Sequence, residues 1–446
     1  MNKQRWFVSS FAFLYLSFFS LLSPSAHAFP LHAPGEKPEA SGIELETGGS
    51  LRMRYEWKRG FALGTPSPID PQDYLLSQLR LHAKLHHADD WAIYVEGQDA
   101  RVNGAFLDNG IADKRSPNTF ADAMDLHQAY LDLGWGDSYG ARVRVGRQKF
   151  NLGALRMVAS LEWVNTARVW DGLRLTQHLG AGRSVDAFAS RLVPVRPERF
   201  NSHALTGNRM FDSRFHGIYY TDTQSINSTR IEPYYLLREN HHAGDRVHTL
   251  GLRYAWRSDA WDSDGELMGQ AGRFGFLRHR AYAAHLGLGR QLDDRLHLGL
   301  AYNLGSGDGN AGDGTHTTFD NLYPLNHAYY GYMDFFSLMN VHNPEAVLTW
   351  KADEKSTLRL AFEEFRLVRA SGDAWYNAGG GVLRRAGGSA PSRVGEEVDF
   401  TASTTLNAWP VHLLLCYSHF FAGPYIRATG TSADADFVFF QSKWSF

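Results

Sequence analysis

The chain alternates apolar and polar residues with a period of two over many successive segments. Between residues 43 and 58 the odd positions are mostly apolar and the even positions mostly charged or polar. The same split recurs over 75–85, 91–98, 128–135 and 142–145. Successive side chains of a β-strand point to opposite faces, so this period indicates strands with one apolar and one polar face. The pattern predicts an all-β fold.

Turn residues between the alternating segments divide the chain into eighteen predicted strands. Their expected spans are 43–58, 74–86, 91–101, 126–135, 141–149, 167–178, 183–193, 215–222, 229–238, 247–257, 264–272, 280–289, 294–304, 344–352, 356–368, 396–408, 411–421 and 434–446. An even number is typical of single-chain bacterial outer-membrane barrels. The span 264–272 is the weakest, and without it the alternative is a barrel of sixteen strands.

A soluble β-sandwich would also alternate, but strand length and connection length favour a membrane barrel. Many predicted strands reach ten residues, beyond the five or six usual in globular sheets. Long connections near 59–73, 102–125, 150–166, 194–214, 305–343 and 369–395 alternate with short ones. Short periplasmic turns and long extracellular loops are typical of such barrels. We expect a transmembrane antiparallel up-and-down β-barrel in the bacterial outer membrane, with lipid around it.

The first 28 residues have the order of a secretory signal peptide. Two basic residues precede the apolar run 6–22, and an A-x-A cleavage site ends at Ala28. The run is shorter than the roughly 20 residues that a spanning helix needs, which argues against an anchor. We expect export with cleavage after Ala28, and residues 29–446 as a single barrel domain.

Composition and motifs exclude several classes of function. The net charge of −2 gives no case for nucleic acid as a partner, and the single Cys416 permits no internal disulfide. No nucleophile or metalloprotease motif is present, so we expect no enzyme. The stretch 308–314 resembles a calcium loop but lacks the later Glu, and adjacent histidines on a strand face opposite ways. We expect neither a metal nor a cofactor.

Cations recur on the polar parity of the predicted strands. A charged side chain cannot face lipid, so these cations are expected to point into the lumen. They are Arg52, Arg54, Arg80, Lys84, Arg142, Arg144, Arg168 and Arg174. A ring of Arg and Lys in a constriction favours anions. The alternative is that they pair with acids such as Glu44, Glu46, Glu56, Glu96 and Asp132 and brace the wall.

Three stretches of the chain resemble the alginate export family of outer-membrane porins. The first is Val145-Gly146-Arg147-Gln148-Lys149-Phe150 with Gly153, Arg156, Trp163-Val164-Asn165-Thr166-Ala167-Arg168 and Asp171. The second is Phe319-Asp320-Asn321-Leu322-Tyr323-Pro324 with His327, Tyr330-Gly331 and Asp334. The third is Tyr417-Ser418-His419-Phe420-Phe421-Ala422-Gly423-Pro424-Tyr425, followed by the terminal strand. They occur in the family's order over most of the chain.

The resemblance implies an eighteen-stranded monomeric barrel whose electropositive lumen passes a polyuronate outward. It implies that Arg147, Arg156, Arg168 and Asp171 shape the path and that the stretch 151–166 folds inward. An ordinary loop clamped by an Arg–Asp pair is the alternative. The family's alginate porin has a long periplasmic plug loop late in the barrel, whereas the chain has only a short turn near residues 407–410. We therefore expect gating by the extracellular loops, or none.

We interpret the chain as an exporter of an anionic, alginate-like polysaccharide. Its expected partners are the polymer and periplasmic export machinery that docks on the short turns. The first alternative is a general or uptake porin for small anions or oligosaccharides, because a passive barrel does not encode direction. A barrel enzyme or an adhesin is the alternative from another class.

Overall fold

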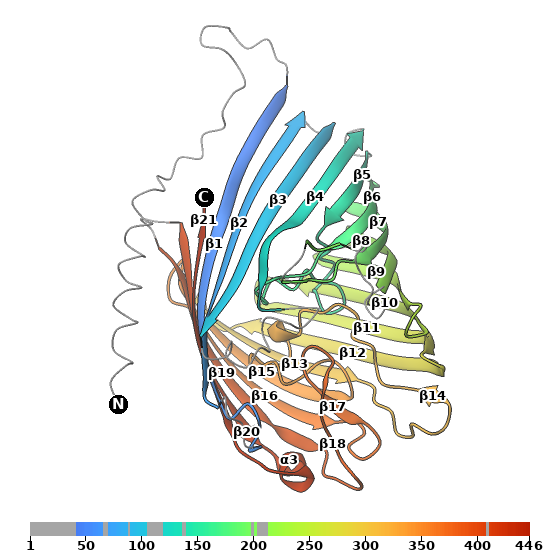
Figure 1. Ribbon diagram of the computed structural model, residues 1–446, viewed down its shortest axis with the longest axis vertical. Helices are drawn as coiled ribbons and strands as arrows, with labels where there is room; N and C mark the ends of the chain where they lie inside the picture. Colours follow the sequence, from blue (N-terminus) through green and yellow to red (C-terminus); the bar gives the residue numbers. More distant parts are fainter. Residues whose placement is uncertain are drawn as a thin grey trace.

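The alternating segments form strands, and each wall strand pairs antiparallel with the next along the chain (Figure 1). The computed structural model describes residues 42–65, 70–87, 90–104, 119–135, 140–197, 200–202, 213–406 and 410–446. The last strand, β21 (Ala435–Ser445), pairs with the first, β1 (Ile43–Arg59). Closure leaves no exposed sheet edge, which a barrel in lipid requires.

The eighteen predicted strands are confirmed. Between β1 and β21 the wall strands are β2 (Gln72–His87), β3 (Trp91–Gly104), β4 (Asp122–Trp135), β5 (Ala141–Gln148), β6 (Trp170–His178), β7 (Arg183–Leu192), β8 (Ser213–Ile226), β9 (Thr229–Asn240), β10 (Asp245–Arg257), β11 (Trp261–Phe274), β12 (Leu277–Gln291), β13 (Leu296–Gly305), β15 (Val341–Lys351), β16 (Thr357–Leu367), β19 (Arg393–Thr405) and β20 (Val411–Ala422). β11, the weakest prediction, pairs with both neighbours along its length, so the sixteen-strand alternative is wrong.

Among the described residues, three further short strands and two short helices lie in the connections. The strands are β14 (Thr315–His316), β17 (Ala374–Tyr376) and β18 (Val382–Arg385), and the helices are the 3-10 turn η3 (Asn326–Ala328) and α3 (Pro424–Thr429). No helix within the described ranges is long and apolar enough to cross a membrane. The predicted signal peptide, residues 1–28, lies outside the described residues and stays a prediction, as does the boundary of the barrel domain.

The two parities of the strands face opposite environments, as the alternation predicts. Apolar side chains of the outer face are open to the surroundings, with Leu250 66 % and Leu267 64 % exposed. Polar side chains of the inner face, such as Arg52, Gln78 and Glu232, are buried. Sequence alone did not predict that burial, because eighteen strands enclose a wide lumen. The connections must therefore fill part of it.

The long connections gather at one end of the barrel, and the start of β1 and the end of β21 lie at the other. β1 begins and β21 ends at the same end, together with the short turns (Figure 1). The predicted long connections lie at the opposite end, which we call the loop end. Short turns are periplasmic and long loops extracellular in barrels of this kind. The loop end therefore faces the outside of the cell.

One predicted strand starts later than expected. The prediction began a strand at residue 167, whereas β6 begins at Trp170. Ala167 has a positive φ of 58°, and the Arg168 backbone N–H donates to Ser160 O at 2.6 Å, within the same connection. Arg168 is therefore a loop residue, and its predicted place on the wall is wrong.

Aromatic packing closes much of the interior at the loop end. Phe336, from the connection before β15, stacks on Phe365 of β16 with ring centroids 3.7 Å apart. Trp375 stacks on Phe336 at 5.3 Å and donates its indole N–H to Phe335 O. These side chains are almost fully buried. The loop end thus has a packed core of its own, which fixes the connections against the wall.

Two glycines of neighbouring strands offer a matched test of the inner and outer faces. A Cβ at Gly251 would lie 2.1 Å from the ring of Tyr234, which stacks on Tyr219, whereas a Cβ at Gly269 meets nothing within 4 Å. Overpacking costs about 1–3 kcal/mol. We expect Gly251→Ala to lower the thermal stability of the refolded barrel and Gly269→Ala to leave it unchanged, measured by loss of β-sheet circular dichroism. Equal effects would contradict the assignment of faces.

Candidate functional site

The connection between β5 and β6, residues 149–169, folds into the barrel and is called here the first inward loop. Asn165 is 1 % exposed, and its side-chain amide donates to the carbonyls of Ser77, Arg101 and Phe120 at 2.8–3.1 Å. Gln78 of β2 donates to Asn165 O at 2.6 Å. An irregular backbone inside a barrel needs such partners, because its polar groups are out of water. The predicted inward fold of 151–166 is thus present.

Wall arginines hold the same loop from β1. Arg52 donates to Glu162 O at 2.6 Å and to Val164 O at 3.0 Å. Arg54 donates to Trp163 O at 2.7 Å and forms an ion pair with Glu56 at 2.7 Å. These two predicted cations therefore serve the loop backbone.

The other side of the loop is anchored on the opposite wall through Arg156. Its guanidinium lies 3.1 Å from Asp264 Oδ2 of β11 and 2.7 Å from His285 Nε2 of β12. The nearby carboxylates raise the pKa of Arg156 against the effect of its burial. Anchored at β1–β3 and at β11–β12, the first inward loop crosses the lumen.

The connection between β13 and β15, residues 306–340, packs against the first and is called the second inward loop. Ala159 N–H donates to Tyr323 O at 2.8 Å, Tyr323 N–H to Met157 O at 3.1 Å and Leu325 N–H to Leu155 O at 3.0 Å. Two of the three stretches that carry the family resemblance thus form one hydrogen-bonded layer. The sequence suggested both stretches but not their pairing.

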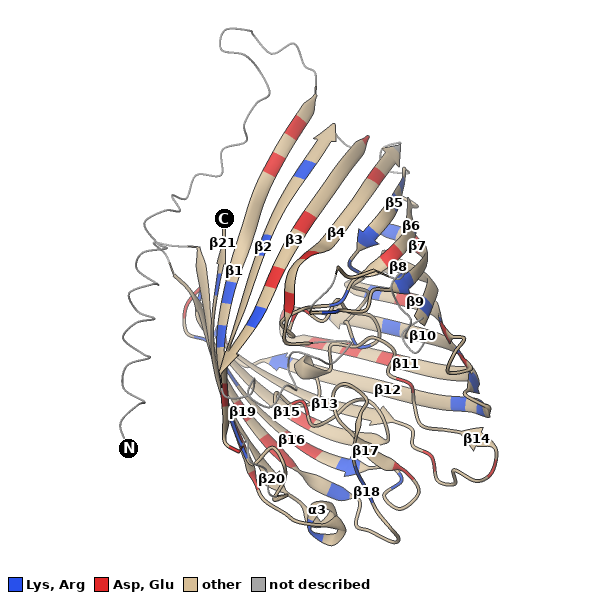
Figure 2. Ribbon diagram, in the orientation of Figure 1, with Lys and Arg blue, Asp and Glu red and all other residues tan. Residues whose placement is uncertain are grey.

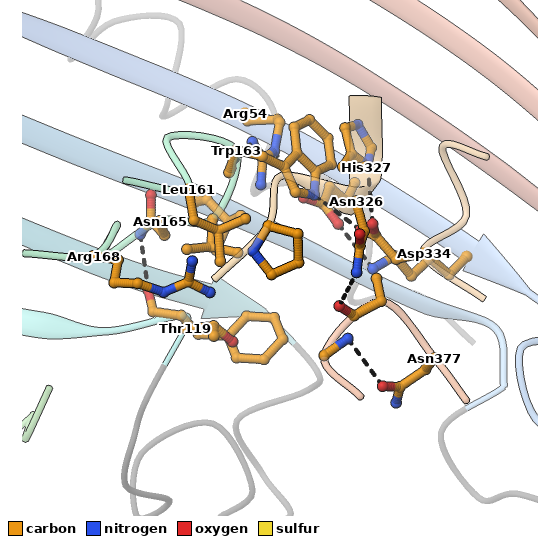
Figure 3. A pocket seen from close by; sticks show the side chains of 18 of the residues that line it. Arg54, Thr119, Leu161, Trp163, Asn165, Arg168, Asn326, His327, Asp334 and Asn377 are labelled. Carbon is orange, nitrogen blue, oxygen red and sulfur yellow. Dashed lines mark hydrogen bonds and ion pairs between the residues drawn. The ribbon is translucent and has the colours of Figure 1, made fainter. Parts of the chain in front are cut away.

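Trp163 joins both inward loops to the wall. Its ring stacks on His327 with centroids 3.4 Å apart, and the Arg54 guanidinium lies 3.8 Å above the ring (Figure 3). Asp334 accepts from the Trp163 indole N–H at 2.9 Å and lies 3.2 Å from His327 Nδ1. Stacking and the shared carboxylate fix the relative position of the loops.

Two cavities of about 360 Å³ each lie beside this layer. One is lined by Arg54, Lys58, Trp163, His327 and Asp334 among others, and the second by Arg238, His316, Asp320 and Asn240 among others. Arg168, Pro324, Asn326, Ala378 and Gly379 line both. The cavities therefore meet around Arg168, whose side chain reaches toward the first of them in Figure 3.

Arg168 differs in its partners from every other predicted cation except Arg52, which likewise has no carboxylate at ion-pair distance among the described residues and donates to loop carbonyls. The Arg168 guanidinium donates to Ala159 O at 3.0 Å and lies 5.5 Å from the ring of Tyr323. Within the described part of the chain it has no carboxylate at ion-pair distance. Loss of water around it lowers the pKa of Arg168 to about 10, so it stays charged at neutral pH. It presents an uncompensated positive charge where the cavities meet.

Apart from Arg52, the remaining predicted wall cations are paired with acids, as the bracing alternative describes. Ion pairs of 2.7–3.9 Å join Arg54 to Glu56, Arg80 to Glu162, Lys84 to Glu46, Arg142 and Arg144 to Asp132, Arg147 to Asp171, and Arg174 to Asp186. Arg147 also donates to the carbonyls of Leu126 and Asn201 at 3.0 and 2.8 Å. The predicted role of these residues in a substrate path stays a prediction.

Glu162 shows how such a pair responds to pH. Arg80 at 2.7 Å and Lys149 at 2.9 Å hold the pKa of the Glu162 carboxyl well below its usual range. A lowered folded-state pKa contributes stability above the ordinary value of the group and loses it as pH falls through the lowered one. This anchor of the first inward loop therefore persists through mildly acid pH.

Sequence reasoning missed a row of buried and half-buried acids on the other side of the lumen. Glu345, Glu363 and Glu397 lie directly opposite one another across β15, β16 and β19, with Asp399 two residues further along β19. Arg359 pairs with Glu345 at 2.9 Å. These acids occupy the inward-facing positions of their strands, so the alternation in the sequence could have identified them as lumen residues. The lumen therefore carries cations and acids together along β1–β6 and mainly acids along β15–β19, rather than a uniformly electropositive lining (Figure 2).

Sequence reasoning also missed inward cations such as Arg238 and Arg359, and it missed Lys443. Lys443 lies opposite Arg52 in the register of β1 and β21, so it shares the inward face, and it is exposed. Phe437 and Phe439 occupy the same parity and are buried against the loops. Because these two phenylalanines are apolar but face inward, the sequence of β21 does not alternate clearly between polar and apolar residues.

No group of three or more His, Cys, Asp or Glu among the described residues is arranged to hold a metal ion. The stretch 308–314 forms turns in which Asp308, Asn310 and Asp313 accept hydrogen bonds from nearby backbone N–H groups. Its side chains are thus occupied in local turns.

Asn165 anchors the first inward loop, so replacing it tests whether its hydrogen bonds hold the loop in the lumen. We expect Asn165→Ala to leave three buried carbonyls without their donor and to weaken the docked loop by about 1–3 kcal/mol. Limited proteolysis within 149–169 should become faster, and single-channel conductance larger and noisier. Asn310→Ala, in an exposed turn, is the matched control. A loop that stays protected in Asn165→Ala would show that other contacts hold it.

Comparison with known proteins places this arrangement in a family. The family model described as alginate export matches residues 43–440. No curated protein matches the chain.

Solved barrels of Pseudomonas aeruginosa share the fold. OpdO superposes with a TM-score of 0.60 at 13 % identity, covering 90 % of this chain and 97 % of that one. OccK2 (OpdF), solved in complex with glucuronate, gives 0.58 at 13 % identity, covering 90 % and 98 %. OccK5 (OpdH) gives 0.59 at 10 % identity, covering 90 % and 98 %.

Proposed function

The chain belongs to the alginate export family of outer-membrane porins, and on that premise we propose that it passes an anionic, alginate-like polysaccharide outward through its lumen. Arg168 carries the proposal: its charge lacks a carboxylate partner within the described residues and it lines both cavities. A uronate carboxylate is the complement of such a guanidinium.

The path that we propose uses few cations, and each of them binds the anionic polymer weakly. Lys443 is exposed to the lumen on the periplasmic side of the inward loops, and Arg168 lies within them. The ion-paired cations contribute a smaller net field, because acids such as Asp132 and Asp171 offset them. Transport needs sites that attract the anion yet release it, so two separated charges suit passage better than one strong site.

A uronate polymer in the first cavity would contact polar and aromatic side chains beside the charged Arg168. Asn326, Asn377, Trp163 and His327 line the first cavity with Arg168 (Figure 3). Amides satisfy hydroxyl groups and rings cover the apolar faces of sugars. The predicted monomeric state and the predicted docking of periplasmic export machinery form part of this proposal.

A second candidate, uptake of small anions such as uronate monomers, is favoured by the size of the cavities. Each holds about 360 Å³, near the lower end of the range for small-ligand sites. A polymer would need the inward loops to move aside, whereas a monosaccharide would not. One structure of similar fold was solved with glucuronate.

Planar-bilayer recording of the refolded porin tests the role of Arg168. We expect anion-selective current that glucuronate oligomers block, and we expect Arg168→Gln to weaken the block about fivefold, the effect of one charge contact of about 1 kcal/mol in water. The control is the charge-balanced pair Asp132→Asn with Arg144→Gln, which removes a wall ion pair. Block that is equal in wild type and Arg168→Gln, or lost equally in the control, would contradict the proposed path.

Flux from liposomes separates the two candidates. If polymer export is the function, Asn165→Ala should speed the release of trapped polyuronate by loosening the inward loop, with glucuronate flux little changed. Passage of glucuronate in both proteins and of polymer in neither would replace export by the uptake alternative.

A further inference from the structure

The outer wall carries a row of arginines at the loop end of β10, β11 and β12. Arg246, Arg273 and Arg278 are exposed on the outward face and lie directly opposite one another in register. Arg280 is the next outward residue of β12. Figure 2 shows the blue segments at these strand ends. We call these four residues the arginine row.

Like charges directly opposite on neighbouring strands destabilise a sheet. Arg246 is offset by Glu239, at 3.3 Å. Arg273, Arg278 and Arg280 have no side-chain hydrogen bond or ion pair within the described ranges of the chain. The row therefore carries at least three uncompensated charges at one height of the wall.

Two other outward arginines at the loop end are compensated. Arg101 of β3 pairs with Asp99 at 2.7 Å, and Arg366 of β16 pairs with Glu364. Both acids lie two residues away on the same strand and face. The sector β10–β12 lacks this local pairing at Arg273, Arg278 and Arg280, and in it these charges lie side by side.

The arginine row stands immediately above the apolar belt. Tyr282, 56 % exposed, follows Arg280 on the outward parity, and Leu286 and Leu288 continue the belt toward Arg290 at the periplasmic end. A shallow apolar groove of about 470 Å³ lies below the row, where Gly269 leaves space among Leu250, Leu267 and Tyr282. Charge and groove therefore coincide at the boundary between hydrocarbon and headgroups.

We propose that the arginine row binds the phosphate groups of an outer-leaflet glycolipid, one of whose acyl chains lies in the groove at Gly269. The loop end faces the outside of the cell, so its outward charges lie at the headgroups of that leaflet. Basic clusters beside a membrane span bind anionic headgroups, and the arginine fork suits phosphate. Phosphate between facing arginines also relieves their mutual repulsion. The site is on the outer wall and is independent of the lumen.

The test is binding of bisphosphorylated lipid A and of its dephosphorylated form to the full barrel in neutral detergent, measured by native mass spectrometry. The variant is Arg273→Gln/Arg278→Gln/Arg280→Gln. The control is Arg101→Gln/Arg290→Gln/Arg366→Gln, which removes the same charge from outward arginines elsewhere. At about fivefold per basic residue, we expect the variant to lose about 100-fold in affinity for the phosphorylated lipid. The control should stay within about threefold, since its arginines lie outside the row.

Wild type should also prefer bisphosphorylated over dephosphorylated lipid A, and over phosphatidylglycerol of the inner leaflet. The heat-dependent shift in gel mobility confirms that each variant is folded. Equal binding of both lipid A forms, or equal losses in variant and control, would overturn the proposal. Unchanged uronate block in the variant is expected, because the row faces away from the lumen, so this result is separate from the transport proposal.

Discussion

A chain that leaves water must find partners for its own backbone, and this constraint shapes both the wall and its contents. The wall meets it by closing β21 on β1. The first inward loop has no regular structure to meet it, so side chains take over. Gln78 and Arg52 of the wall donate to loop carbonyls, and Asn165 of the loop donates to carbonyls of Ser77 and Arg101 in the wall. Each such bond is worth little in water but much where water is scarce. The lumen can hold loops only because its wall is polar.

The wall was predictable and its contents were not, for a physical reason. Alternation is a local signal, and every strand repeats it, so eighteen strands emerge even where 264–272 is weak. Contacts between inward loops are not local: Val158 meets Tyr323 and Trp163 meets His327 across more than 150 residues. Only the family resemblance pointed to those stretches. The alternation also failed to identify Lys443 as an inward cation. Phe437 and Phe439 share its face, because they pack against the inward loops.

The candidate site was predictable as a set of residue types but not as a set of roles. Parity placed Arg52, Arg144 and Arg174 in the lumen, where they do lie, yet it could not say which would have partners. Pairing depends on the neighbouring strand: Asp132 faces Arg144, and Asp186 lies within reach of Arg174. Arg168 lacks such a neighbour because it leaves the sheet before β6 begins. The error in the predicted strand boundary and the distinct role of this residue have the same cause.

The same reasoning applies to both faces of the wall. An arginine beside a carboxylate is neutralised and stabilises the sheet, as Arg101 does with Asp99 outside and Arg147 with Asp171 inside. An arginine without one costs stability unless an anion from outside the chain completes it. Within the described residues such arginines include Arg168, where cavities meet, and the row around Arg278, at the loop end of the outer wall, as well as Arg52, which loop carbonyls complete. In both proposals an anionic ligand completes guanidinium groups that have no carboxylate partner among the described residues.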